Sequence, residues 1–194
     1  MLRHMSDWPM RDITDPRMLR AMAHPLRLRL MNDLVIHGPA TATELADRLD
    51  ESPANCSWHL RQLAKFGFIE EAADLPSTGR NRPWRWIPVG NQWGNPAGSP
   101  EMAIAGREVT AALLGYELGE LNAWDAREPE EPEQWQQAAF TTQTIAWLTA
   151  EELAEVREKI REVTMRHIDR IAEPDKRPAG ARPIRFIAWG VPAR

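Results

Sequence analysis

Residues 52–68 place apolar side chains at the spacing of one amphipathic helix. Cys56, Leu60 and Leu63 recur at i, i+4 and i+7 and so form an apolar stripe. Ser52 suits the N-cap and Pro53 the first turn. The polar and aromatic side chains on the opposite side and flanks are Asn55, Ser57, Trp58, His59, Arg61 and Gln62. Such groups meet phosphates and base edges in DNA complexes, although an ordinary surface helix shows the same pattern.

Three further helices are expected before residue 52. The first begins after Asp15 and is interrupted at Pro25, because a proline inside a helix removes a hydrogen bond. The second carries leucines at i, i+4 and i+8 and ends at a Gly-Pro pair. The third opens with a capping box at residues 41–44. Two short helices joined by a tight turn form a helix-turn-helix, whose second helix suits the major groove.

Two strand-like runs follow the helix at 52–68. They flank a polar turn that contains Gly79, which is a hairpin signal. Arg80, Arg82 and Arg85 lie at the tip and on the second arm, where arginine can contact the DNA backbone or the minor groove. A helix-turn-helix followed by a hairpin predicts a winged helix, with residues 68–89 as the wing.

These segments resemble the winged-helix bacterial transcription regulators of the ArsR type. The resemblance rests on AMAHPLRLRLMNDL, TATELADRL and SPANCSWHLRQLAKFGFIEE and covers residues 14–90. It implies a dimeric regulator that binds double-stranded DNA, with the helix at 53–66 in the major groove. A homodimeric repressor is the form we expect, with an activator as the alternative. The DNA-binding residues expected from motif and position are Thr43, Ser52, Asn55, Ser57, Trp58, His59, Arg61, Gln62, Arg80, Arg82 and Arg85. Trp58 is unusual on a DNA face; it either packs on sugar or a thymine methyl, or covers the base of the wing.

A metal sensor is not expected. Metal-sensing members of the ArsR type carry paired cysteines, whereas Cys56 stands alone. The histidines show no metal-ligand spacing, and no thiolate or carboxylate pair joins them. Cys56 is interpreted as a small buried hydrophobe, with a redox role as the alternative.

The second half of the chain is expected to follow the order helix, strand, helix, strand. A helix from residue 100 to about 124 has two apolar rows, so it packs either within its own domain or also against a second subunit. Residues 138–148 and 184–190 are strand-like, and a helix from 149 to about 172 has a 3-4 apolar seam. His167 lies on that seam and is interpreted as a core histidine. The candidate dimer contacts are Val109, Leu113, Tyr116, Leu153, Val156, Ile160 and Val163.

Aromatic residues of this half define a candidate effector pocket. Pockets for small apolar effectors are mostly apolar, with few polar groups. The candidates are Tyr116, Trp124, Trp135, Trp147 and Trp189. An ordinary aromatic core is the alternative interpretation.

Composition fixes the class of protein more than its function. The fold class expected is mainly α with a small β content (α+β), with a DNA-binding domain at 1–92 and a dimerisation and effector domain at 93–194. A single cysteine, a polar N-terminus without a signal peptide and the lack of a membrane-length apolar run favour the cytoplasm. Residues 1–90 hold 12 basic and 11 acidic side chains, and residues 91–194 hold 12 and 17, so only the first half suits a polyanion.

A transcription regulator is therefore the leading hypothesis, and a winged-helix module that docks on protein is the alternative. An enzyme is not expected, because the sequence has no Gly-rich phosphate loop, no GxSxG and no metal box. Ser57 and His59 stand two apart on a helix, so they do not face each other as a nucleophile and base would. No cofactor is expected.

Overall fold

The computed structural model describes residues 8–76, 82–94 and 99–193. The chain is a mainly α-helical α+β protein that divides into two compact units. The N-terminal unit is Asp7–Tyr116, and the C-terminal unit holds the described residues from Glu117 onward. Helix α5 (Pro100–Arg127) contributes to both. The expected functional division between residues 92 and 93 stays a prediction.

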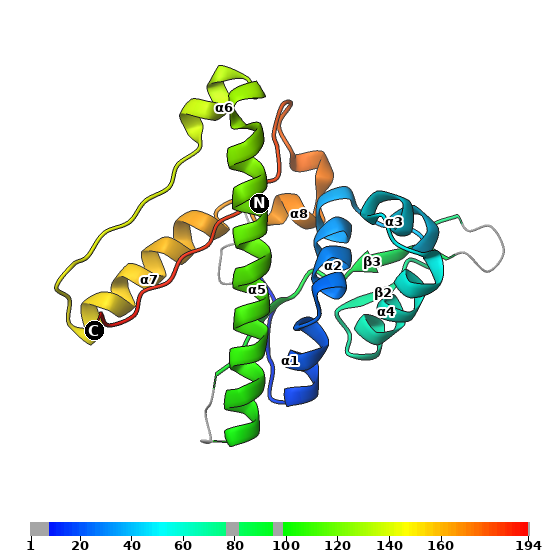
Figure 1. Ribbon diagram of the computed structural model, residues 1–194, viewed down its shortest axis with the longest axis horizontal. Coiled ribbons are helices and arrows are strands. Elements are labelled where there is room, and N and C mark those ends of the chain that lie inside the picture. The colour runs from blue at the N-terminus through cyan, green and yellow to red at the C-terminus, as the bar shows by residue number, and fades with distance from the viewer. Residues whose placement is uncertain (1–7, 77–81, 95–98, 194) are drawn as a thin grey trace. The chain divides into compact units, whose positions relative to one another are not determined.

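The N-terminal unit consists of four short helices, two small sheets and the first part of α5 (Figure 1). Each helix begins at a residue suited to it: Asp15, His24, Thr41 and Ser52 cap the four helices with their side chains. The predicted break at Pro25 is confirmed, because Pro25 is the first residue of the second helix. The elements are α1 (Pro16–Met22), α2 (Pro25–His37), α3 (Ala42–Leu49), α4 (Pro53–Lys65), β1 (Met10–Asp12), β2 (Ile69–Glu71), β3 (Trp84–Trp86) and β4 (Gly90–Gln92).

One hydrophobic core joins these elements. Leu19, Leu30, Leu45 and Leu60 come from α1, α2, α3 and α4 and are fully buried in it. The first part of α5 closes the core with Met102, Ala105 and Val109. Because every helix contributes a leucine or several apolar residues to the same cluster, the position of α4 is set by all of its neighbours.

The two sheets each have two strands. β2 and β3 are antiparallel, with Ile69 opposite Trp86 and Glu71 opposite Trp84. β1 and β4 are parallel, with Met10 opposite Gly90. The sequence patterns contain no signal for this second sheet, and it was not predicted.

Arg11 of β1 reaches the end of α4. Its guanidinium donates to the backbone carbonyls of Phe66 (3.3 Å) and Gly67 (3.0 Å) and to Oδ1 of Asn91 (2.7 and 3.0 Å). The same group lies over the ring of Phe68, 4.8 Å from its centroid. The orphan carbonyls at the end of a helix need such donors. β1 therefore fixes the C-terminal end of α4.

The C-terminal unit is more open. It contains the end of α5, then η2 (Glu128–Glu130), α6 (Glu133–Ala138), α7 (Ala150–Met165), α8 (Asp169–Ala172) and η3 (Pro174–Lys176). A capping box begins α7: the Thr149 hydroxyl accepts from the Glu152 amide, and the Glu152 carboxylate accepts from the Thr149 amide. The helix ends at Met165, before the expected residue 172.

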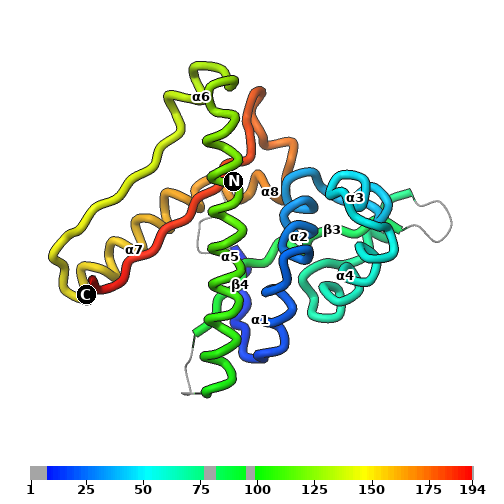
Figure 2. Tube along the Cα trace, viewed as in Figure 1, coloured from blue at the N-terminus to red at the C-terminus, as the bar shows by residue number. Residues whose placement is uncertain are grey.

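The two strands predicted for this unit are wrong. Residues 139–149 and 181–193 are extended but pair with no strand in the described part of the chain. Figure 2 shows the first of these segments in yellow between α6 and α7. The Phe, Thr, Ile and Trp side chains that favour strands do so by packing on a half-buried sheet. Here Trp147 is 100% exposed, so that packing is missing.

Salt bridges hold the second of these segments to α5 and to Glu131, which lies between η2 and α6. Arg185 pairs with Glu117 (3.2 Å) and Glu120 (3.3 Å) of α5. Arg182 pairs with Glu131 at 2.6 Å, and its guanidinium lies over the ring of Trp135. The Glu131 side chain is only 18% exposed, because Arg182 and Arg127 cover it.

Candidate nucleic-acid interface

Helices α3 and α4 form a helix-turn-helix. The turn consists of residues 50–52, and Asp50 adopts a left-handed conformation with φ of 53°. The Asp50 and Glu51 amides both donate to the carbonyl of Ala46, which closes the end of α3. Aspartate tolerates the left-handed region better than most residues. Ser52 then accepts from the Asn55 amide at 3.2 Å and begins α4.

The inward stripe of α4 is as predicted. Cys56, Leu60 and Leu63 are fully buried in the core. Burial also raises the pKa of the Cys56 thiol, which disfavours the reactive thiolate. The interpretation of Cys56 as a small buried hydrophobe is confirmed in its burial.

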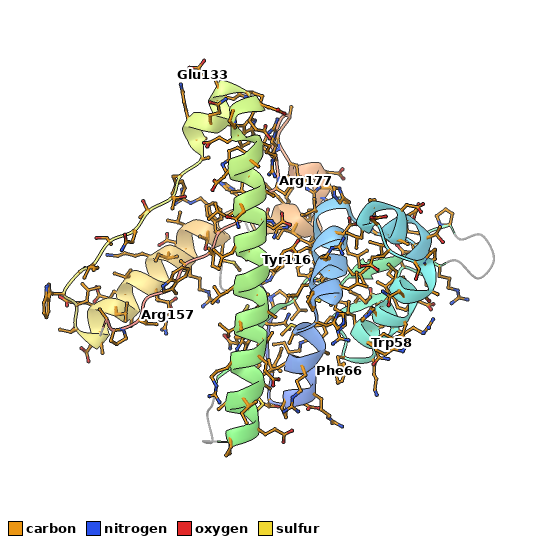
Figure 3. All side chains as sticks on the ribbon, in the orientation of Figure 1. Trp58, Phe66, Tyr116, Glu133, Arg157 and Arg177 are labelled. Carbon is orange, nitrogen blue, oxygen red and sulfur yellow. The ribbon has the colours of Figure 1, made fainter. Side chains whose placement is uncertain are left out.

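The outward face of α4 presents mixed chemistry. Trp58 is 49% exposed and lies at the outer surface of the helix (Figure 3). The Arg61 guanidinium donates to Ser57 Oγ at 2.6 Å, and the Asn55 side chain donates to Glu51 at 3.1 Å. Ser57 and Gln62 are half-buried. The face thus combines one cation, two amides, a hydroxyl and an indole on one rigid element.

Lys65 belongs to this face and was not predicted. It is exposed in the last turn of α4, four residues after Arg61 and seven after Trp58, so all three lie on one side of the helix. The i, i+3 and i+7 spacing of Trp58, Arg61 and Lys65 is already visible in the sequence. Lys65 gives the face a second positive charge.

His59 is a correction to the predicted face. It was expected on the flank of the exposed side, but the side chain is buried and only 5% exposed. The junction between α1 and α2 covers it: the His24 ring lies 4.3 Å away between centroids. His59 is therefore not available to DNA in this conformation.

The remaining predicted contacts of the helix-turn-helix lie at helix starts. Thr43 is exposed in the first turn of α3, and Ser52 is exposed at the N-cap of α4. Backbone amides at helix N-termini bind phosphate well. Both positions are thus accessible to a DNA backbone.

The wing carries paired arginines. Arg82 pairs with Glu71 at 2.9 Å, and Arg85 pairs with Asp74 and, at 3.5 Å, with Glu70. Arg80 lies outside the described residues. The wing arginines would have to exchange these carboxylates for phosphate, which lowers their net contribution to DNA affinity.

The candidate effector pocket is not assembled within the C-terminal unit. Trp124 and Trp135 are half-buried beneath Arg127 and Arg182, respectively. Trp147 is fully exposed and Trp189 is 73% exposed, so neither lines an enclosed site. Tyr116, the fifth candidate, is half-buried at the end of the N-terminal unit.

The predicted dimer contacts divide into two groups. Val109 is a correction, because it is fully buried in the core of its own unit, and Leu113 packs against that core. On α7, Leu153 is half-buried, whereas Val156, Ile160 and Val163 are 38%, 41% and 61% exposed. His167 on the same seam is exposed, which contradicts its interpretation as a core histidine.

Metal coordination and membrane insertion are two other roles for which the described residues can be compared with the known requirements. Within them, no three His, Cys, Asp or Glu side chains are placed to hold a metal ion. In residues 8–76, 82–94 and 99–193, no helix has both the length and the apolar character needed to cross a membrane.

Comparison with known proteins identifies one domain of the chain. Residues 22–72 match the family described as a helix-turn-helix domain. This range begins at the last residue of α1 and includes α2, α3, α4 and β2. Reduced HlyU from Vibrio cholerae N16961 is a similar solved structure, with 21% identity, a TM-score of 0.31, and coverage of 46% of this chain and 79% of that one. No curated protein matches the chain. Residues 22–72 of the chain thus form a helix-turn-helix domain, the type of domain that places its second helix in the major groove of DNA.

Proposed function

We propose that this chain is a sequence-specific regulator of the ArsR type that binds double-stranded DNA as a homodimer and represses transcription. Helix α4 enters the major groove, and the wing at residues 68–89 contacts the flanking backbone or minor groove. The protein acts in the cytoplasm, without a cofactor and without enzymatic activity.

The outward face of α4 carries this proposal. Its exposed side chains are Asn55, Trp58, Arg61 and Lys65. The opposite side of the helix is fixed in the core by Cys56, Leu60 and Leu63, which position the helix but do not contact DNA. Amide side chains read base edges, and cations neutralise phosphates. The Arg61–Ser57 hydrogen bond orders the guanidinium before DNA arrives, which reduces the entropy lost on binding.

The homodimer is supported by the apolar surface of the C-terminal unit. Every fully buried apolar residue of the described chain precedes residue 117, so the described part of this unit has no core of its own. The seam residues Val156, Ile160 and Val163 are exposed on α7. A large exposed apolar surface marks an interaction site, and a two-fold dimer covers the same patch on both copies. A dimer would also present two α4 helices to half-sites about 34 Å apart.

The proposal includes binding of a small apolar effector by the C-terminal unit. A small apolar effector would have to bind the DNA-competent dimer and the incompetent dimer with different affinities. The half-buried Trp124 and Trp135 are the aromatic candidates that keep the partly enclosed surroundings such a ligand needs.

A protein-docking module is the second candidate, and one observation favours it. The wing arginines Arg82 and Arg85 are already paired with Glu71 and Asp74, so the described wing offers less free positive charge than a DNA-binding wing normally does. In that case the exposed Trp58 would anchor a protein partner, because tryptophan is enriched at the centre of interfaces.

Titration of the purified chain with DNA separates the two candidates. The DNA is the region upstream of its own gene together with a pool of random duplexes from which bound sequences are selected. A regulator enriches one motif with two-fold symmetry and loses affinity steeply with salt. A docking module enriches no motif, and its residual binding to random DNA equals its binding to the upstream region.

A further inference from the structure

Three aromatic rings connect the junction of α1 and α2 to the exposed face of α4. His24, at the N-cap of α2, faces His59 of α4 with 4.3 Å between ring centroids and a tilt of 41°. Trp58 meets His59 edge-on, with 4.7 Å between centroids and an interplanar angle of 88°. The last ring is half exposed on the proposed DNA face. All three rings belong to the N-terminal unit.

The surroundings of His24 and His59 favour the neutral form of both rings. His24 Nδ1 accepts from the Leu26 amide at 3.2 Å, so its proton lies on Nε2 and the ring caps α2 in its neutral form. Protonation at Nδ1 would oppose a donor to a donor and break this cap. His59 Nδ1 is buried without a hydrogen-bond partner in the described residues, where an added charge would be costly.

We propose that His59 is a positioning residue for DNA binding: the neutral His24–His59 pair holds the Trp58 indole in place, and its protonation in mildly acid solution releases the indole and weakens sequence-specific binding. This inference rests on the proposed function of α4 and names a regulation of that same surface.

The charges around the His24–His59 pair oppose protonation of either neutral ring. Arg27 of α2 is fixed in place by donating to the carbonyls of Arg20 and Ala21. Acidic groups nearby are engaged elsewhere: Glu51 pairs with Arg29, and Glu108 of α5 pairs with Arg20 of α1. The other titratable group on this side of α4 is the buried Cys56 thiol. Water reaches His24 from a surface depression of about 400 Å³ lined by Arg20, Ala23, His24, Pro25, Arg27 and Glu108.

The direction of the pH effect follows from burial. Burial lowers the pKa of His59, and His24 and Arg27 lower it further against an opposing effect of Glu51. Burial and then Arg27 lower the pKa of His24. The folded chain therefore binds fewer protons than the unfolded chain below the ordinary value of 6.5. The stability that the neutral pair provides is complete above that pH and is lost as the pH falls through it toward the folded-state pKa values.

The test compares specific and unrelated DNA at two pH values with the full chain. Specific DNA is the duplex selected at about pH 8, and affinity is measured by fluorescence anisotropy at about pH 8 and about pH 5.5. Loss of one specific contact weakens discrimination between DNA sequences by about fivefold or more, so the wild-type preference for specific DNA should fall by at least that factor at about pH 5.5. His59→Phe keeps a ring against Trp58 without a proton, and its preference should stay constant. His167→Gln, at an exposed histidine of the C-terminal unit, should behave as wild type.

A second readout tests the positioning link without DNA. The Trp58 indole N–H signal in the NMR spectrum, assigned by Trp58→Phe, should shift with the same midpoint as the His24 and His59 ring signals. In His24→Asn, which keeps an N-cap acceptor, that midpoint should change. The inference is overturned if the Trp58 signal does not shift while the histidine ring signals titrate. It is also overturned if the DNA preference of His59→Phe changes with pH as that of wild type does. Absence of specific binding at about pH 8 overturns the proposed function instead, and the indole signal still decides the ring link.

Discussion

The guanidinium of Arg11 donates to the backbone carbonyl of Gly67 at 3.0 Å, across 56 residues of sequence. Gly67 is the residue with φ of +68° that follows the end of α4, and a Cβ there would meet Arg11 Nη1 at 3.3 Å. One side chain of β1 thus secures the point at which the recognition helix gives way to the wing. The same arginine also binds Asn91 of β4, so the end of α4, β1 and β4 share one hydrogen-bonding centre.

Arg11→Ala should destabilise the N-terminal unit. It removes charge-assisted hydrogen bonds to two helix-end carbonyls and to Asn91, which corresponds to about 1–3 kcal/mol in the free energy of unfolding. Urea unfolding of the variant measures it. Arg17→Ala is the matched control, because Arg17 is exposed and pairs only near the surface with Asp15; its effect should stay within about 0.5 kcal/mol. Equal effects of the two substitutions would contradict the role given to Arg11.

The Asp33–Arg48 pair should be the strongest ionic tie between α2 and α3. The Asp33 carboxylate is buried, with 7% of the side chain exposed, and lies 2.8 Å from Arg48 Nη2 and 3.9 Å from His37 Nε2. Asp33→Asn leaves the arginine without its counterion. Because Arg48 keeps access to solvent, the expected loss is about 1–2 kcal/mol rather than that of a fully buried pair.

Asp47→Asn is the control for this pair, since Asp47 is an exposed acid on the same helix as Arg48. Thermal unfolding of both variants, followed by circular dichroism, gives the comparison. A melting temperature for Asp33→Asn equal to that of Asp47→Asn would show that burial of the carboxylate adds nothing to the pair.

Sequence patterns were sufficient for the helix-turn-helix because its evidence is local. The stripe of Cys56, Leu60 and Leu63 and the caps at Thr41 and Ser52 are separated by a few residues, and the structure has them as expected. The same helical spacing places Lys65 on the exposed face, but the prediction of that face stopped before the last turn of the helix. Local periodicity therefore fixes which side of α4 is buried.

Features that depend on distant residues were not accessible in the same way. His59 lies at the border of the apolar stripe, and only the packing of His24 decides that it is buried. Arg11 stands in a segment without periodicity, and its partners are 55 to 80 residues away. Residues 139–149 have strand composition but find no strand to pair with in the described chain, since composition specifies a preference and not a partner.

Substitutions on α4 should separate phosphate binding from base reading. Arg61→Ala and Lys65→Ala each remove a cation from the exposed face, so affinity for specific and unrelated DNA should fall together. The slope of log affinity against log salt should decrease by about 1 for each. Asn55→Ala should instead cost about 1–3 kcal/mol for the selected DNA only, because an amide reads base edges.

Lys159→Ala provides the control for the salt measurement, since it removes an exposed cation from α7 in the C-terminal unit. Its salt slope should equal that of wild type. If Arg61→Ala left both affinities unchanged, the outward face of α4 would not be the surface that meets DNA, even if the chain bound DNA elsewhere.

The seam on α7 should control self-association. Ile160 is 41% exposed, so Ile160→Asp costs little in the folding of one chain but places a charge in the centre of an apolar contact between two copies. The few hot-spot residues at the centre of an interface contribute about 2 kcal/mol or more, so the dimer dissociation constant should rise at least about thirtyfold if Ile160 is one of them. Sedimentation equilibrium over a range of concentrations measures this, and circular dichroism verifies that the helices are retained.

The neighbouring Lys159→Asp introduces the same side chain one position off the seam, and it should leave the dissociation constant within about threefold of wild type, as expected for a residue at the rim of an interface. If both substitutions weakened association equally, added negative charge rather than loss of the apolar contact would be responsible. A chain that stays monomeric at all concentrations would exclude the seam as a homodimer contact. A dimer that tolerates Ile160→Asp would place the interface elsewhere, and then two copies of α4 would have to be spaced by a surface other than α7.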